Sequence, residues 1–133
     1  MGFRTEIPVA ARQAFLTGGH SQNDTYFIAL YEKQAPRDKY SANGESGGQG
    51  YTPGGQLLDG HASGIKDGRA WLNWSKSPSW PRASVSASEA LIYNQSRGGT
   101  AVAILKLDQT YKSVNGEFAL EFPANGLTAL VVL

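Results

Sequence analysis

The stretch Glu89–Leu107, EALIYNQSRGGTAVAILKL, consists of two apolar runs joined by a short polar break. The runs, Glu89–Gln95 and Thr100–Leu107, are rich in the aromatic, aliphatic and β-branched residues that favour strands. The break, Ser96–Gly99, contains two adjacent glycines, which adopt the backbone angles that a tight connection requires. This pattern predicts a β-hairpin, and the second half of the chain is therefore expected to fold as antiparallel strands.

The segments on either side of this hairpin also have the period of a strand. In Arg69–Ser75, RAWLNWS, large apolar residues recur at every second position. In Glu117–Phe122, EFALEF, phenylalanine and leucine alternate with glutamate and alanine, as in a strand that is buried on one face. The Asn-Gly pairs at 115–116 and 125–126 supply turns on either side of it. A last strand is expected within Leu127–Leu133.

The first part of the chain predicts one helix and one strand. The helix is expected in Glu6–Gly19, where Pro8 suits a first turn and a Gly-Gly pair ends the apolar period. Because this helix is short, we expect it to form only when Phe15 and Leu16 dock onto the rest of the domain. The following segment, Asp24–Tyr31 (DTYFIALY), is apolar on both faces, which indicates a strand covered on both sides.

The segment 35–68 has no clear period. Half of the sixteen glycines of the chain lie between Gly44 and Gly64. A connection of this length without secondary structure is unusual in a compact domain. We therefore expect this segment either to be functional or to contain short strands, one of them within 55–64.

These segments predict a single domain over residues 1–133. The length and the hydrophobic content of 41% suffice for one core without covalent cross-links. The expected fold class is all-β, an antiparallel β-sandwich of hairpins with an immunoglobulin-like or jelly-roll-like arrangement. Residues 1–20 are expected to form an N-terminal arm with the one short helix, and 35–68 a long glycine-rich loop insertion.

Composition argues against several classes of function. The net charge is +1, the charged fraction is 17%, and lysine and arginine are scattered, so no basic face predicts binding to nucleic acid or to an anionic membrane. The chain has no cysteine, which excludes disulfides, zinc–thiolate sites and thiol nucleophiles. No signal-peptide pattern is present, and no apolar run approaches the roughly 18 residues of a membrane span. We expect a soluble product made in a cytosol.

No motif in the sequence predicts an active site. The glycines of 44–56, GESGGQGYTPGGQ, lack the spacing and the following lysine of a phosphate-binding loop. His20 and His61 lie in glycine-rich contexts, which favours loop histidines over metal ligands or catalytic bases. Glu117 and Glu121 are about 13 Å apart along one strand face, too far for a glycosidase pair. We therefore expect neither an enzyme nor a bound cofactor or metal ion.

The aromatic residues leave a binding function open. Trp71, Trp74 and Trp80, with Tyr51 and Tyr93, would form a stacking platform for a sugar or a single-stranded nucleic acid if they shared one exposed face. Strand alternation favours a core position for Trp74, and the prolines around Trp80 favour a packed strand entry. Core packing is the preferred interpretation, with protein–protein contact second and a ligand platform third.

Several segments, in this order, resemble a family of small virion proteins of tailed bacteriophages and prophages. The resemblance extends over about residues 24–133 and rests on DTYFIALY, NGESGGQGYTPGGQLL, GRAWLNWSKSPSW, SASEALIYNQSRGGTAVAILKL and VNGEFALEFPANGLTALVVL. The segment LKLDQTY departs from the more Phe/Gly-rich segment of related sequences. The resemblance implies a β-sandwich that is a non-enzymatic, multi-copy part of a phage particle, assembled in the cytoplasm of the bacterial host.

The resemblance leads to the hypothesis of a capsid decoration or cement protein that bridges and stabilises major capsid subunits. The candidate contact residues are Phe3 and Arg4 in the N-terminal arm and Gln49, Tyr51 and Gln56 in the glycine-rich loop. A tail or neck adaptor, or fibre-attachment protein, is the first alternative, and a carbohydrate-binding module is the second. The expected partners are the major capsid protein or tail and neck proteins, in a symmetric multi-copy assembly.

Overall fold

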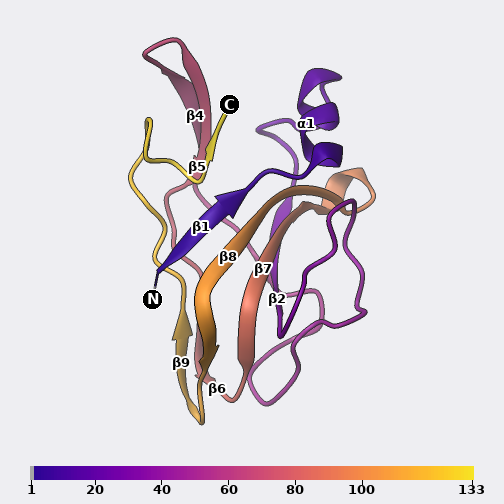
Figure 1. Ribbon diagram of the computed structural model, residues 1–133, viewed down its shortest axis with the longest axis vertical. Coiled ribbons are helices and arrows are strands. Elements are labelled where there is room, and N and C mark those ends of the chain that lie inside the picture. Colours follow the sequence, from indigo (N-terminus) through magenta and orange to yellow (C-terminus); the bar gives the residue numbers. More distant parts are fainter. Residues whose placement is uncertain (1) are drawn as a thin grey trace.

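The hairpin predicted around Ser96–Gly99 forms the centre of the structure (Figure 1). The structure is a computed structural model that describes residues 2–133. Its elements, in chain order, are β1 (Phe3–Glu6), α1 (Val9–Leu16), β2 (Tyr26–Tyr31), β3 (Gln56–Leu57), β4 (His61–Lys66), β5 (Arg69–Trp74), β6 (Ser79–Ala83), β7 (Ser86–Asn94), the 3₁₀ turn η1 (Gln95–Arg97), β8 (Thr100–Lys112), β9 (Gly116–Ala119) and β10 (Val131–Val132).

The strands form three antiparallel sheets. The largest has the order β1-β8-β7-β2-β3, and it faces a three-stranded sheet, β10-β5-β4, and a two-stranded sheet, β6-β9. The connection between β7 and β8 is the predicted one, with η1 followed by Gly98 and Gly99 at positive φ. These sheets confirm the predicted all-β antiparallel sandwich with one short helix.

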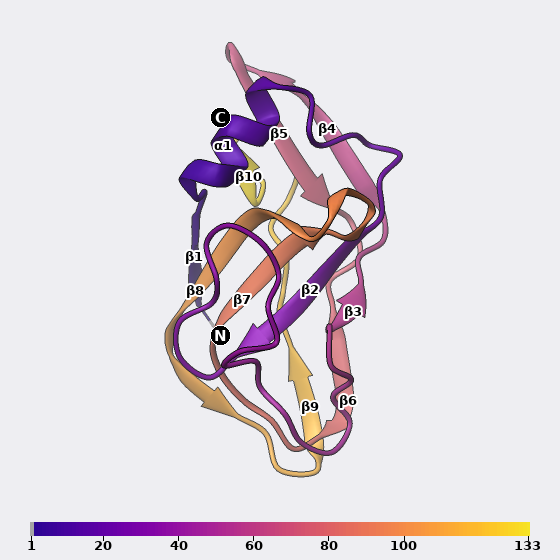
Figure 2. The same ribbon diagram turned by 90° about the vertical axis from the view of Figure 1, so that its right-hand side faces the viewer.

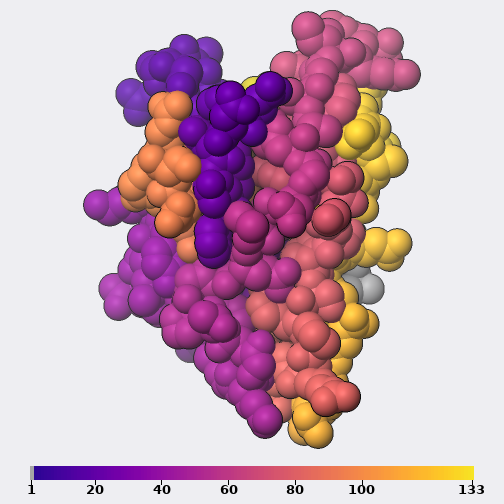
Figure 3. Space-filling view, turned by 180° about the vertical axis from the view of Figure 1, so that it is seen from behind, coloured from indigo at the N-terminus to yellow at the C-terminus, as the bar shows by residue number. Residues whose placement is uncertain are grey.

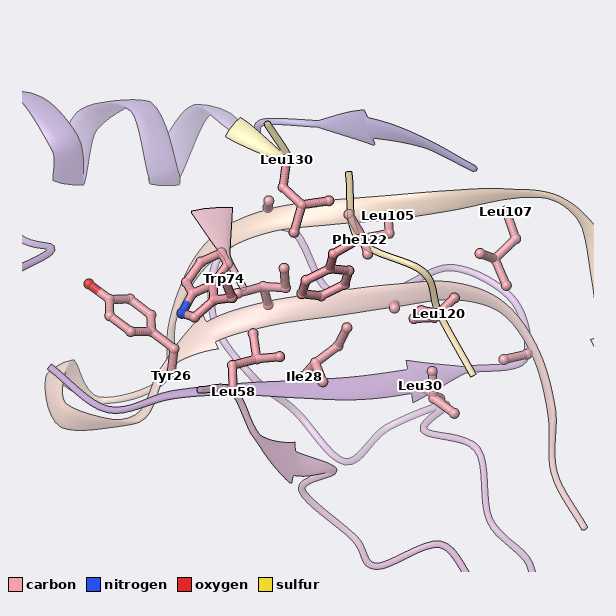
Figure 4. Packing of buried hydrophobic residues seen from close by; sticks show 14 of the residues in the cluster. Tyr26, Ile28, Leu30, Leu58, Trp74, Leu105, Leu107, Leu120, Phe122 and Leu130 are labelled. Atoms are coloured by element: carbon pink, nitrogen blue, oxygen red, sulfur yellow. The ribbon is translucent and has the colours of Figure 1, made fainter. Parts of the chain in front are cut away.

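The main hydrophobic core fills the space between the largest sheet and the two smaller ones. Figure 4 shows its side chains converging from β2, β5, β8 and the segment after β9. Trp74 is buried there, as its alternation predicted. The alternation of EFALEF is also confirmed, because Phe118, Leu120 and Phe122 are all buried. The segment 127–130, in contrast, forms a turn, and only Val131–Val132 are paired as a strand.

The glycine-rich segment covers the opposite face of the largest sheet. Figure 2 shows the chain between β2 and β3 lying across β7 and β2. Beneath it lies a second apolar cluster, to which β2 contributes Ala29 and Tyr31 and β7 contributes Leu91 and Tyr93. This covering layer explains why β2 is buried on both faces, as its sequence predicted.

Hydrogen bonds to Glu45 hold the glycine-rich segment in place. The hydroxyl of Tyr40 donates to its carboxylate at 2.6 Å, and the Gly54 amide donates at 2.8 Å. The Tyr51 hydroxyl donates to the same carboxylate and accepts the Leu30 amide of β2 at 2.9 Å. The prediction of a loop over 35–68 needs correction at its end, where 56–66 contain β3 and β4 as the sequence had left open.

The N-terminal region contains one element that the sequence did not predict. Helix α1 starts after Pro8, as expected, and buries Ala11 with Phe15 against the core, but Leu16 is 87% exposed and does not dock. The unexpected element is β1, which pairs with Ile104–Leu107 of β8. The arm is therefore an edge strand of the largest sheet.

Candidate functional site

Helix α1 and the β4–β5 hairpin are two projections at one end of the molecule. Figure 1 shows them on either side of β10. Figure 3, seen from behind, shows that both project beyond the rest of the molecule. The hairpin turns at Asp67 and Gly68, with φ of 49° and 73°. Two successive positive φ angles give the tight two-residue turn whose twist matches that of the strands. The space between α1 and this hairpin is called the cleft below.

Two hollows form the interior of the cleft, and Phe15 lines both of them. The inner hollow, of about 220 Å³, is lined by Phe15, Tyr26, His61 and Leu72 among others. The outer hollow, of about 340 Å³, is lined by Arg12, Phe15, Leu16 and Leu133. One wall is therefore the helix with the loop after it, and the other is the face of the β10-β5-β4 sheet.

The inner end of the cleft is closed by a row of aromatic rings. Phe15 meets His20 edge to face at 4.8 Å between centroids, and Tyr26 stacks on His61 at 5.6 Å. The edge of Trp74 then meets His61 at 5.7 Å. These contacts join the helix arm, β2 and the three-stranded sheet, so the inner end of the cleft is rigidly packed.

His20 and Asp24 are bridged by an asparagine. The Asn94 side-chain amide donates to Asp24 Oδ2 at 2.9 Å and lies 3.1 Å from His20 Nδ1. Asn94 Oδ1 accepts the Ser96 amide, which fixes the amide nitrogen toward the histidine. With the amide in this orientation His20 Nδ1 is the acceptor, and Nε2 is buried with no hydrogen-bond partner among the described residues.

The structure brings His20 and His61 to the same hollow, which their separation in the sequence did not predict. Burial lowers the pKa of both imidazoles below the usual 6.5. Among residues 2–133, no three histidine, aspartate or glutamate side chains gather in a way that would hold a metal ion.

We expect the free energy of unfolding to fall as the pH is lowered from about 7 to about 5. Because the pKa of each histidine is lower in the folded state, the unfolded state binds more protons in this window, and acid favours unfolding. Urea titrations at several pH values measure the effect. His61→Phe keeps a ring against Tyr26 and should weaken the pH dependence. A free energy of unfolding that stays constant across this window would contradict the assignment.

The outer part of the cleft exposes aliphatic side chains. Leu16 of α1 and Ile65 of β4 are 87% and 81% exposed, and Leu133 is 41% exposed. Ile65 pairs with Ala70 and so lies on the same sheet face as the buried Leu72. The apolar face of the three-stranded sheet thus continues beyond the core and is left uncovered there. Exposed apolar surface that is continuous with a core is typical of a protein-binding site.

The five contact residues predicted from the sequence do not form one surface. Phe3 and Arg4 lie on β1, at one edge of the largest sheet, with Phe3 half-buried against the core. Gln49 and Gln56 lie near β6, where the Gln49 carbonyl accepts the Ser84 amide and the Gln56 side chain donates to the Ser79 carbonyl at 2.9 Å. The exposure expected for Tyr51 is corrected: this residue lies in the core, 7% exposed, stacked on Trp80.

The tryptophans do not share an exposed face. Trp74 and Trp80 are buried in the main core, which confirms the preferred interpretation. Trp71 is half-buried on the other face of β5, where its ring lies over Gly64. The cleft residues Leu16 and Ile65 were not selected from the sequence as contact residues. The segment that contains Ile65 has no clear period in the sequence, so no local pattern pointed to that residue.

Comparison with known proteins found no matching family model, curated protein or solved structure. In the part of the chain that the structure describes, no helix is long and apolar enough to cross a membrane.

Proposed function

We propose that this protein is a non-enzymatic structural component of a tailed-phage virion, specifically a capsid decoration protein that bridges major capsid subunits. The observation that carries the proposal is the pair of projections with exposed Leu16 and Ile65. A rigid sandwich with uncovered apolar side chains at one end suits a protein whose work is attachment. The ordered sequence resemblance to virion proteins supplies the biological setting.

The mechanism of such a protein is selective binding to the assembled lattice. Each copy would bury the cleft residues against a capsid subunit, at a gain of about 25 cal/mol for each Å² of apolar surface. Because binding requires subunits in their assembled positions, it stabilises the lattice over its separated parts by mass action. Many weak contacts of this kind add up over a symmetric particle.

Removing the protein from the particle should make the particle release its DNA at a lower temperature. A dye-based assay measures the temperature of DNA release for complete particles and for particles that lack the protein. Purified protein is then added back to the particles that lack it, and the release temperature is measured again. Wild-type protein and Val114→Asp, which changes an exposed residue between β8 and β9, should restore the release temperature. Leu16→Asp should not.

Copy number separates the capsid location from the tail or neck. Quantitative mass spectrometry of purified particles should find on the order of hundreds of copies for a decoration protein and on the order of ten for a tail or neck adaptor. An unchanged release temperature together with a low copy number would contradict the decoration role, and absence from purified particles would contradict the virion role altogether.

A further inference from the structure

The outer strands of the three sheets differ in how well their edges are protected. β3 and β10 have two residues each, and β1 has four, two of which are the charged Arg4 and Glu6. β6 contains Pro81 and a bulge between Trp80 and Ala83, and its partner β9 has four residues. Short length, charge, proline and bulges are the features that keep an edge strand from pairing with another chain.

β4 lacks these features along most of its length. It has six residues, without proline or acid, and its single charge, Lys66, is at its end. It pairs with β5 in unbroken register from His61–Trp74 to Lys66–Arg69. Within residues 2–133, its backbone makes no hydrogen bond to a strand other than β5. β4 is therefore a regular edge with unused backbone donors and acceptors.

The surroundings of β4 define which side chains a neighbouring strand would carry. Ile65 and Ala70 lie on the cleft face, and the Leu133 amide donates to the Ala70 carbonyl, which places Leu133 beside Ala70 on the side of β5 away from β4. Leu133 and Leu16 line the same hollow. A strand added beside β4 would place every second side chain on the face that carries the exposed Ile65, so alternate residues should be aliphatic.

The charges around the cleft indicate which residues should stand between the aliphatic residues of the partner segment. Segments 9–19 and 61–72, which form the two projections, contain Arg12, Lys66 and Arg69 but only one acid, Asp67. Arg12, Lys66, Arg69 and Asp67 are all exposed. A partner segment with acidic residues between its aliphatic ones would therefore be favoured over a basic one.

We propose that β4 binds an extended segment of a partner chain as a fourth strand of the β10-β5-β4 sheet, and that this segment alternates aliphatic and acidic residues. Main-chain hydrogen bonds along β4 supply part of the affinity, and the side chains of β4, with Ile65 on one face and Lys66 on the other, select the sequence. The inference deepens the proposed function and rests on it in one respect, namely that the partner is another virion protein.

The test uses the purified chain and labelled synthetic peptides in a fluorescence anisotropy titration. The peptide VEIEVEIE should bind, and VKIKVKIK should bind about tenfold more weakly. Two further copies of VEIEVEIE carry N-methyl groups on alternate amides, one on the odd-numbered and one on the even-numbered residues. Only one of the two should lose binding, because only one set of amides faces β4. Hydrogen exchange should slow at amides of 61–66 when VEIEVEIE is added.

Two protein variants locate the binding site. Ile65→Asp should weaken VEIEVEIE about tenfold or more, whereas Val114→Asp should bind like the wild type, because that residue is exposed but lies outside the cleft. Since Ile65 is 81% exposed, its replacement should leave the circular dichroism and the urea midpoint unchanged.

Several results would overturn the inference. They are absence of VEIEVEIE binding at about 1 mM peptide, equal binding of both N-methylated copies, and equal binding of VKIKVKIK. A dimer in light scattering that Ile65→Asp dissociates would also overturn it, since a second copy would then occupy the edge. Peptide binding by a protein that is absent from particles would refute the proposed function alone, and decorated particles without peptide binding would refute this inference alone.

Discussion

Gly55→Ala is expected to lower the free energy of unfolding by at least about 3 kcal/mol. Gly55 has a φ of +82°, and a Cβ placed there would lie 1.8 Å from the Ile28 carbonyl oxygen and 2.8 Å from the Ala29 Cα. Both neighbours are backbone atoms of β2, which lies inside the largest sheet between β7 and β3. They cannot move without disturbing that pairing, so the substitution adds a steric clash to the left-handed strain. Urea unfolding followed by tryptophan fluorescence measures the loss.

Gly44→Ala is the matched control for this prediction. Gly44 has a similar φ of +79°, but no atom lies within 4 Å of the position of its Cβ. The free energy of unfolding of Gly44→Ala should fall only by the cost of placing an alanine in the left-handed region, about 1–2 kcal/mol. Equal losses in the two variants would show that close approach to β2 has no energetic weight. Since the total free energy of unfolding of such a domain is about 5–15 kcal/mol, the difference between the two variants is measurable.

The strands that could be predicted from the sequence are those with a local pattern, such as an alternation of apolar and polar residues that marks the buried face. Phe118, Leu120 and Phe122 are buried because every second residue of an extended chain points the same way, whatever its partner. β7 and β8 were predictable from their apolar, β-rich runs, with the glycines of their connection marking the turn. These features are local, so a single sequence contains them.

The elements that escaped prediction depend on partners far away in the chain. β1 has four residues, too few for a period, and it is a strand only because Ile104–Leu107 of β8 lie beside it. The last segment is apolar throughout 129–133, yet its strand is only Val131–Val132, because the chain turns just before it, where the Ala129 amide donates to the Gly126 carbonyl. Register and turn position at these places are properties of the assembled sheet.

The candidate site was less predictable than the fold. Exposure of Leu16 and Ile65 depends on how far α1 and the β4–β5 hairpin extend beyond the core, which no local pattern specifies. Tyr51 was named from the sequence as a candidate contact residue of the glycine-rich loop. Instead, the Tyr51 hydroxyl accepts the Leu30 amide of β2, which ties the loop to the sheet through residues far apart in the sequence. Glu45 accepts the hydroxyls of Tyr40 and Tyr51 within the loop.

Tyr51→Ala is expected to lower the free energy of unfolding by about 3–5 kcal/mol, as other truncations of buried aromatic residues do. The ring of Tyr51 stacks on Trp80 at 6.1 Å between centroids and belongs to the main core. Its hydroxyl accepts the Leu30 amide at 2.9 Å and donates to the Glu45 carboxylate. The substitution therefore leaves a cavity and also removes the hydrogen-bond partner of both groups. Urea unfolding again provides the measurement.

Tyr51→Phe separates the two contributions, because it keeps the ring and removes only the hydroxyl. Leaving the Leu30 amide and one Glu45 oxygen without this partner should cost about 1–3 kcal/mol. Tyr111→Phe is the matched control, since its hydroxyl donates to Asp108 at an exposed site, and its urea midpoint should not change. The alternative is that Tyr51 is a surface anchor for a partner. In that case all three variants would unfold at the wild-type urea midpoint, and only particle binding would suffer in the two Tyr51 variants.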